Sequence, residues 1–221
     1  EYRPMASITK LMTAMVALDH SKDLFRQLQL NTTVRSNLPR GTYTRQELFN
    51  AMLVRSDNAA AETLAGDYPG GRREFIWQMN QQAKAWGINA TFRDPTGLDR
   101  NNMATAGDVG TMAAYASGYW VIRDASVKKT VAFERKFKKK LRKIQLNNTN
   151  RLLLMEFDEI IASKTGYTGP AGYCVALVVE HQKQRRVIVV LGERNKARRT
   201  DTVQDIMYNH VLDQNLQDPS Y

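Results

Sequence analysis

Ser7 and Lys10 form a residue pair whose types and spacing suit nucleophilic chemistry. They lie three residues apart at the start of a run from Ser7 to Leu18 that contains neither Gly nor Pro. In a helix the two side chains share one face, and the backbone N–H of Ser7 lies at the positive end of the helix dipole. A hydroxyl nucleophile, an amine and an oxyanion donor would then meet. The amine is a usable base only if burial or a nearby cation lowers its pKa.

Ser56-Asp57-Asn58 is a second stretch with polar side chains at a break between two helical patterns. All three residue types compete with a helix by bonding to their own backbone, so the tripeptide is expected on a helix–helix connection. Without other support, both this stretch and the Ser7–Lys10 pair are compatible with ordinary caps and turns. In a cleft, Ser56 would relay a proton to a leaving amine, and Asn58 would hold a substrate amide carbonyl.

Lys164-Thr165-Gly166 is a third such stretch, and it follows a short apolar run from Ile160 to Ser163 that is typical of a strand. Gly166 would let an extended peptide lie flat along the strand edge, with the Thr165 hydroxyl and the Lys164 amine beside it. The N–H of Tyr167 would be a second oxyanion donor beside that of Ser7.

The elements that must position these residues fall into a helical part and a strand-rich part. Capping boxes at Thr44–Glu47 and Thr105–Asp108 and a C-cap at Gly87 mark helices, so residues 44–127 are predicted to be mostly helical. The expected helices are residues 7–19, 44–54, 59–65, a segment ending at Trp86, 105–118 and 200–212. The expected strands are residues 130–134, 160–163, 173–179 and 186–191, the last two forming an antiparallel hairpin.

This order predicts an α+β fold, in which a helical lobe of about residues 20–127 is inserted within an antiparallel β-sheet with flanking helices. We expect residues 1–221 to form a single domain. A nucleophile helix that packs against a sheet normally follows strands of that sheet. The strands that would precede Glu1 are therefore expected to be missing from this sequence.

Composition limits the remaining functions. The chain has a net charge of +10 and a pI near 9.8, and no apolar run approaches the roughly 18 residues of a membrane span. Cys174 has no second cysteine to pair with and is expected to be a buried thiol. The three histidines are isolated, so no metal site is predicted. The basic stretch Arg135–Lys143 is either a solvated hairpin or an anion-binding patch. No nucleic-acid motif accompanies the charge.

The three stretches, in this order, resemble the signature of penicillin-binding proteins and class A β-lactamases. The wider pattern resembles the low-molecular-mass penicillin-binding proteins of the D-alanyl-D-alanine carboxypeptidase/endopeptidase family. It comprises Pro4–Thr13, Met79-Asn80, Gly87, Pro95–Leu98, Thr105–Asp108, Lys164–Thr168 and Ala171–Cys174.

The resemblance implies a serine peptidase without a cofactor that acts on peptidoglycan stem peptides in the periplasm or otherwise outside the cytoplasmic membrane. β-Lactam antibiotics would acylate its nucleophile. Apart from the resemblance, the positive charge of residues 135–143 predicts contact with an anionic polymer such as a cell-wall glycan. The resemblance assigns catalysis to Ser7, Lys10 and Ser56, and substrate binding to Asn58, Lys164, Thr165, Gly166, Tyr167 and Arg198.

Within this family, Tyr68–Gly71 and Asn148–Asn150 resemble the endopeptidase branch, which cleaves crosslinks. Only 55 residues follow Gly166 in this sequence, so we expect it to lack the C-terminal β-domain and anchor helix common in the carboxypeptidase branch. A carboxypeptidase that removes terminal D-alanine is the alternative, as is a penicillin-sensing or glycan-binding module without turnover. A class A β-lactamase is disfavoured because no Glu-x-x-x-Asn lies between Asn58 and Lys164. A basic nucleic-acid module would rest on charge alone.

Overall fold

A computed structural model of the chain describes residues 1–31, 33–137, 140–155 and 157–212, with the side chains of residues 136, 137, 140 and 142 left aside. Its helices are η1 Ala6–Thr9, α1 Lys10–His20, α2 Arg45–Val54, α3 Asn58–Gly66, α4 Gly71–Ala85, α5 Ala106–Ala116, α6 Trp120–Ser126, η2 Arg151–Leu154, α7 Lys196–Ile206 and the π-helical turn η3 Met207–Val211. Its strands are β1 Arg3–Pro4, β2 Gln27–Gln29, β3 Thr42–Thr44, β4 Ala90–Thr91, β5 Met103–Ala104, β6 Thr130–Phe137, β7 Lys140–Asn147, β8 Ile160–Thr168, β9 Gly172–His181 and β10 Gln184–Glu193.

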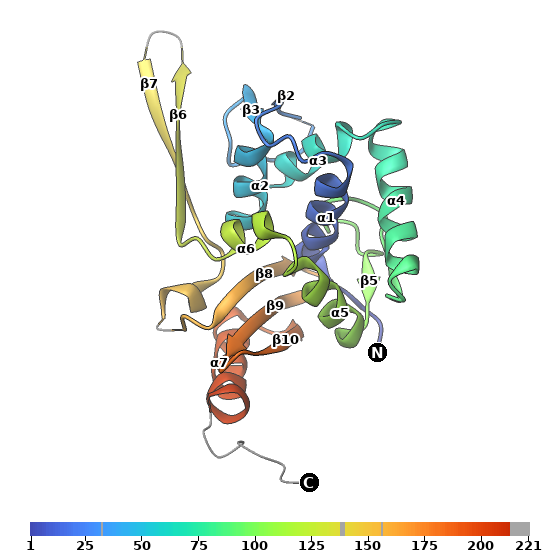
Figure 1. Cartoon of the computed structure of the whole chain (residues 1–221), viewed down its shortest axis with the longest axis vertical. Coiled ribbons are helices and arrows are strands. Elements are labelled where there is room, and N and C mark those ends of the chain that lie inside the picture. The colour runs from blue at the N-terminus through green and yellow to red at the C-terminus, as the bar shows by residue number, and fades with distance from the viewer. Residues whose placement is uncertain (32, 138–139, 156, 213–221) are drawn as a thin grey trace.

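The antiparallel sheet β10-β9-β8 lies between the helical part of the chain and α7 (Figure 1). β8 forms one edge of this sheet, and β9 pairs with both of its neighbours. Helix α5 packs on one face, against β9 and β10, and α7 packs on the same two strands. The prediction of an α+β fold is therefore confirmed.

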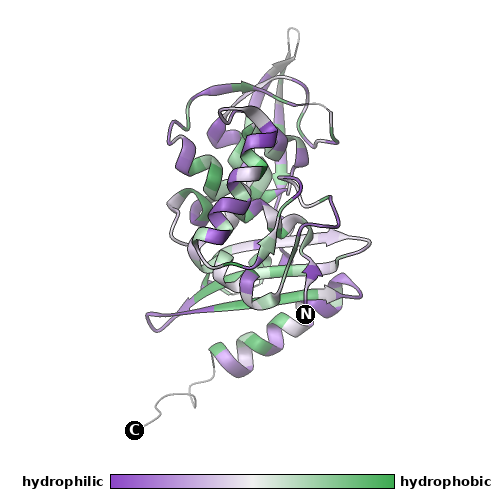
Figure 2. Cartoon of the chain, turned by 90° about the vertical axis from the view of Figure 1, so that its right-hand side faces the viewer, coloured by the Kyte–Doolittle hydropathy of each residue, from purple (hydrophilic) through white to green (hydrophobic). Residues whose placement is uncertain are grey.

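The central strand β9 is buried on both faces, which explains why its sequence is an almost continuous apolar run. Because side chains alternate along a strand, the two halves of the run join different cores. One set packs with the helical part and comprises Cys174, Ala176 and Val178. The other set packs with Val203 and Met207 of the C-terminal helical segment and comprises Val175, Leu177 and Val179. Figure 2 shows that this helical segment carries both hydrophobic and hydrophilic residues, as expected for a helix covering a sheet.

Helix α2 begins where the sequence predicts. The Thr44 hydroxyl accepts from the Glu47 N–H at 3.2 Å, and the Glu47 carboxylate accepts from the Thr44 N–H at 2.9 Å, which completes the capping box. Ser56-Asp57-Asn58 lies on the connection from α2 to α3, also as predicted.

Three boundaries differ from the sequence-based expectations. The first helix opens with the 3₁₀ turn η1, and its α-helical part begins only at Lys10. Lys164 lies inside β8 and not after it, because pairing with β9 continues to Thr168↔Gly172. The closing helix begins at Lys196, where the Asn195 side chain caps it by accepting from the Arg198 N–H.

The basic stretch Arg135–Lys143 spans the β6–β7 hairpin. Its predicted contact with a glycan falls largely on residues outside those described. Of its described side chains, Arg135 pairs with Glu47 of α2 and lies over the Tyr43 ring. In the described part of the chain no helix is both long and apolar enough to cross a bilayer.

The helical part contains a buried ion pair that joins three of its elements. The Arg45 side chain is fully buried and donates to Asp67 at 2.6 Å and to the Ala17 carbonyl at 2.6 Å. Arg26, whose side chain is half exposed, also pairs with Asp67 at 2.8 Å.

Replacing Arg45 is predicted to destabilise the fold far more than replacing Arg26. Arg45→Met leaves the buried Asp67 carboxylate with one exposed partner, and such losses cost about 3 kcal/mol or more. Arg26→Met removes only an exposed charge, which is worth about 1 kcal/mol or less. Urea unfolding monitored by circular dichroism measures both free energies of unfolding, and equal losses in the two variants would contradict this assignment.

Candidate active site

Ser7 lies on a turn that is tightly packed from two sides. Ala6, directly before it, has a φ of 46°, a conformation that residues other than Gly rarely adopt. A Cβ at Gly97 would lie 1.9 Å from the Ala6 carbonyl oxygen, and a Cβ at Gly166 would lie 3.0 Å from the Ser7 nitrogen. Only glycine fits at Gly97. The two glycines therefore allow the loop after Pro95 and the strand β8 to hold the Ser7 backbone in place.

The Lys10 amine is buried next to Ser7. It donates to the Ser7 Oγ at 2.9 Å, to Asn58 Oδ1 at 2.8 Å and to the Thr96 carbonyl at 2.6 Å. All three acceptors are neutral oxygens. Burial lowers the pKa of Lys10 to about 7, although the carboxylates of Asp94, Asp57 and Glu62 act in the opposite direction. A neutral amine in this position can accept the proton of the Ser7 hydroxyl.

Ser56 and Lys164 form a second serine–lysine contact. The Lys164 amine donates to the Ser56 Oγ at 3.0 Å and to the Thr165 carbonyl at 2.9 Å. Burial lowers the pKa of Lys164 well below its usual value, and the nearby cations Lys10 and Arg199 lower it further. These shifts disfavour its charged form before an anion arrives.

The connection that carries Ser56 is fixed by its neighbour. Ser56 itself has a φ of 62°. The buried Asp57 carboxylate accepts from the Ala60 N–H at 2.9 Å and from the Asn37 N–H at 2.5 Å. It also accepts from the Ser36 hydroxyl, which lies 3.0 and 2.9 Å from its two oxygens. These bonds cap α3 and hold the left-handed turn, as is common for strained residues at functional sites.

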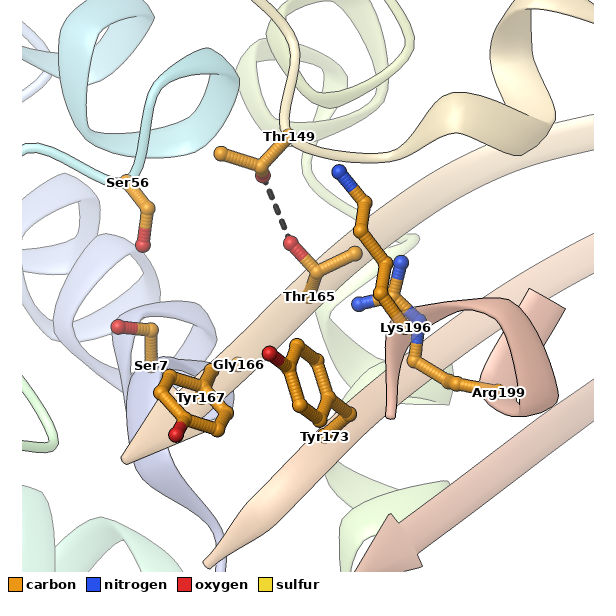
Figure 3. A pocket seen from close by; sticks show the side chains of 9 residues that line it. All are labelled: Ser7, Ser56, Thr149, Thr165, Gly166, Tyr167, Tyr173, Lys196 and Arg199. Carbon is orange, nitrogen blue, oxygen red and sulfur yellow. Dashed lines mark hydrogen bonds between the residues drawn. The ribbon is translucent and has the colours of Figure 1, made fainter. Parts of the chain in front are cut away.

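A cleft of about 240 Å³ opens in front of Ser7 (Figure 3). The Thr165 hydroxyl at its centre donates to the Thr149 hydroxyl at 2.7 Å. The rings of Tyr167 and Tyr173 lie 4.3 Å apart and form an aromatic wall. The residues that line the cleft are Ser7, Ser56, Thr149, Thr165, Gly166, Tyr167, Tyr173, Lys196 and Arg199.

The structure thus brings eight of the nine predicted site residues together. Asn58 contributes through its bond to Lys10 and does not line the cleft. Their chemical roles remain predictions.

The placement of Arg198 was wrong. Arg198 is exposed and does not line the cleft. Its neighbour Arg199 lines the cleft and is itself buried, with 3% of its surface exposed. The reason is helical register: α7 begins at Lys196, and residues three apart share one face, so Lys196 and Arg199 point the same way. The Nη1 of Arg199 lies 3.5 Å from the Cys174 carbonyl, and its Nε and Nη2 have no partner among the described residues.

Sequence reasoning also missed Thr149, Tyr173, Lys196 and the Thr96 carbonyl as parts of the site. Thr149 stands in a stretch that carried the family resemblance, but no sequence signal shows its contact with Thr165, 16 residues away. Among the described residues, no group of three His, Cys, Asp or Glu side chains is arranged to hold a metal ion.

Comparisons with known proteins agree with this geometry. The sequence profile described as D-alanyl-D-alanine carboxypeptidase matches residues 1–195. A D-alanyl-D-alanine endopeptidase of Escherichia coli is 35% identical over 204 residues, which cover 88% of this chain and 65% of the relative. The chain therefore spans slightly less than two thirds of that relative's length.

Two solved structures are similar over nearly the whole chain. The Streptomyces K15 DD-transpeptidase superposes with a TM-score of 0.85 at 25% identity, covering 93% of this chain and 87% of that one. Penicillin-binding protein D2 of Listeria monocytogenes, in a cefotaxime-bound form, gives a TM-score of 0.80 at 28% identity, with coverages of 94% and 87%.

Gly97→Ala is predicted to cost about 3 kcal/mol or more of the free energy of unfolding, because the methyl group collides with the backbone before Ser7. Gly87→Ala is the matched control. Gly87 has a similar φ of 67°, but a Cβ there meets nothing within 4 Å, so only backbone strain of about 1–2 kcal/mol is expected. Denaturant unfolding gives both values. If the two substitutions cost the same, Gly97 does not support the Ser7 turn through close packing.

Proposed function

Because the chain belongs to the D-alanyl-D-alanine carboxypeptidase family, we propose that it is a serine-type D-alanyl-D-alanine peptidase of peptidoglycan stem peptides. The observation that carries this proposal is the contact of a buried Lys10 amine, with a pKa of about 7, to the Ser7 hydroxyl at 2.9 Å. We further propose that residues 1–221 act as one extracytoplasmic or periplasmic domain with a helical part of about residues 20–127 inserted.

In the acylation step, Lys10 Nζ takes the proton of Ser7 Oγ while this oxygen attacks the carbonyl carbon of the penultimate D-alanine. The backbone N–H groups of Ser7 and Tyr167 stabilise the oxyanion, and losing one such donor typically costs about 10²–10³ in rate. The C–N bond then breaks, and Ser56, which Lys164 holds at 3.0 Å, passes its proton to the departing amine. Ser56 takes a proton back from the protonated Lys10, so both residues end the step neutral. In deacylation, water attacks the ester carbonyl carbon and gives a proton to Lys10; the ester C–O bond breaks, and Ser7 Oγ takes that proton back from Lys10.

The edge strand β8 supports the mode of substrate binding. Beyond Ser163, whose N–H donates to the Ser126 hydroxyl at 3.1 Å, the outer edge of β8 can pair with an extended stem peptide, and the close approach at Gly166 keeps Ser7 beside that edge. Thr165 and Arg199 bind the substrate carboxylate next to the scissile bond. Arg199 stays charged, because arginine does not lose its proton in proteins. The arriving carboxylate then favours protonation of Lys164.

We favour the endopeptidase activity, since the Escherichia coli relative at 35% identity is named an endopeptidase and Tyr68–Gly71 and Asn148–Asn150 resemble that branch. A carboxypeptidase or a non-turnover penicillin sensor would use the same centre. β-Lactams are proposed to acylate Ser7, and the cefotaxime-bound form of a similar structure supports this.

The wild-type chain is expected to split crosslinked muropeptide dimers into monomers, and Ser7→Ala is expected to leave them intact. Mass spectrometry of the products measures this directly. Loss of terminal D-alanine alone would assign carboxypeptidase activity instead. A penicillin adduct on Ser7 without turnover of either substrate would overturn the peptidase proposal and leave a sensor.

The rate of Ser7 acylation by penicillin is expected to rise as pH increases through about 7, because Lys10 must lose its proton to act as the base. Intact-protein mass spectrometry at pH values below, at and above this pKa measures the rate. Lys10→Arg keeps a cation that cannot deprotonate, so its rate should fall by about 10²–10⁴ at every pH. A flat pH profile in the wild type would exclude Lys10 as the titrating base.

A further inference from the structure

Three cationic residues gather beside the cleft without being part of the proposed catalytic centre. The Thr149 N–H donates to the Val54 carbonyl at 3.0 Å, and this bond brings two distant segments together. Arg55 follows directly in one segment, and Arg151 begins η2 in the other. Lys196, at the start of α7, lines the cleft next to Thr149 (Figure 3).

No ion pair neutralises these three cations among the described residues. Within the described part of the chain, the Arg55 side chain makes a single polar contact, a long one of 3.5 Å to Asn37 Oδ1. Asp57, which is near Arg55 in the chain, is already bonded to Ser36, Asn37 and Ala60. The pKa of Lys196 is lowered by its partial burial and by the charges of Arg151, Arg199 and Arg55. Like charges held this close favour binding of an anion.

The position of these cations relative to Ser7 indicates which part of a substrate they meet. In Figure 3, Lys196 and Arg199 lie on the far side of Thr165 from Ser7. Thr165 and Arg199 are the residues that bind the carboxylate of the leaving group in the proposed reaction. A group contacting Lys196 therefore lies beyond that carboxylate, on the leaving-group side of the scissile bond.

We propose that Lys196, Arg151 and Arg55 form a second anion subsite, which binds a further carboxylate carried by the leaving group of a crosslinked stem peptide. The inference rests on the proposed peptidase function and deepens it. Free D-alanine has one carboxylate, next to its amine. A diamino diacid in a crosslink has that carboxylate and, at the other end of its chain, a second carboxyl group or a peptide that bears one. The subsite would therefore select crosslinks over simple D-alanyl termini.

Three synthetic substrates with the same acyl-D-alanyl part test this proposal. Their leaving groups are D-alanine, D-2-aminoheptanoate and D-2-aminopimelate. The last two have the same chain length, but only D-2-aminopimelate carries a second carboxylate. The kcat/KM for the aminopimelate substrate divided by that for the aminoheptanoate substrate therefore measures the effect of this carboxylate. The ratio in the wild type is expected to favour the dicarboxylate by about tenfold, since each partly exposed charge pair contributes roughly two- to fivefold.

The variants Lys196→Gln, Arg151→Gln and Arg55→Gln should each lower this ratio by about two- to fivefold, and the triple variant should bring it close to one. Lys196→Arg keeps the charge and should retain most of the preference. Lys84→Gln is the matched control, because Lys84 is exposed on α4 and does not line the cleft. Added salt should also reduce the wild-type ratio.

The outcomes separate the subsite from the peptidase function. Cleavage of all three substrates with a wild-type ratio near one would overturn the subsite and leave the peptidase function standing. A preference for the dicarboxylate substrate that persists in the triple variant would also overturn the subsite, since other residues would then bind the second carboxylate. If the protein cleaves none of the three substrates and also forms no penicillin adduct on Ser7, both proposals are overturned.

Discussion

The Lys10 amine is buried against three neutral oxygens, and the rest of the site depends on this contact. Lowering its pKa from 10.5 to about 7 corresponds to on the order of 4 kcal/mol of folding free energy lost at neutral pH. The sign follows from linkage: the unfolded chain binds the extra proton, so the penalty is largest below the folded pKa and disappears as pH rises past 10.5. The buried carboxylates of Asp94 and Asp57 reduce the penalty without touching the amine.

The elements around Lys10 exclude water from this amine and hold its hydrogen-bond partners in place. The loop after Pro95 brings the Thr96 carbonyl to Nζ and, through Gly97, packs under the turn that carries Ser7. The α2–α3 connection, capped by Asp57, supplies Asn58. Strand β8 closes the other side at Gly166 and is the edge strand of its sheet. The strained backbone at Ala6 is maintained by these contacts, as expected for a preorganised site.

Local sequence signals predicted the parts of the site that depend on short-range geometry. The i, i+3 spacing placed Lys10 beside Ser7, and the capping boxes located α2 and α5. The substrate-side arginine was misplaced because a shift of one residue turns a helical side chain by about 100°, and the start of α7 was not identified. Contacts such as Thr149–Thr165, Thr96–Lys10 and Lys196 at the cleft join segments far apart in the chain. No periodicity or turn signal encodes them, so only the folded structure reveals them.

The central claim is that the Lys10 amine is neutral for a large fraction of molecules at physiological pH. An NMR titration of the Lys10 Nζ and Cε resonances, assigned by comparison with Lys10→Arg, tests this claim most directly. We predict a transition near pH 7 for Lys10, well below the ordinary lysine value of about 10.4. A Lys10 transition close to that ordinary value would contradict the account, because the amine would then stay protonated and could not take the proton of Ser7.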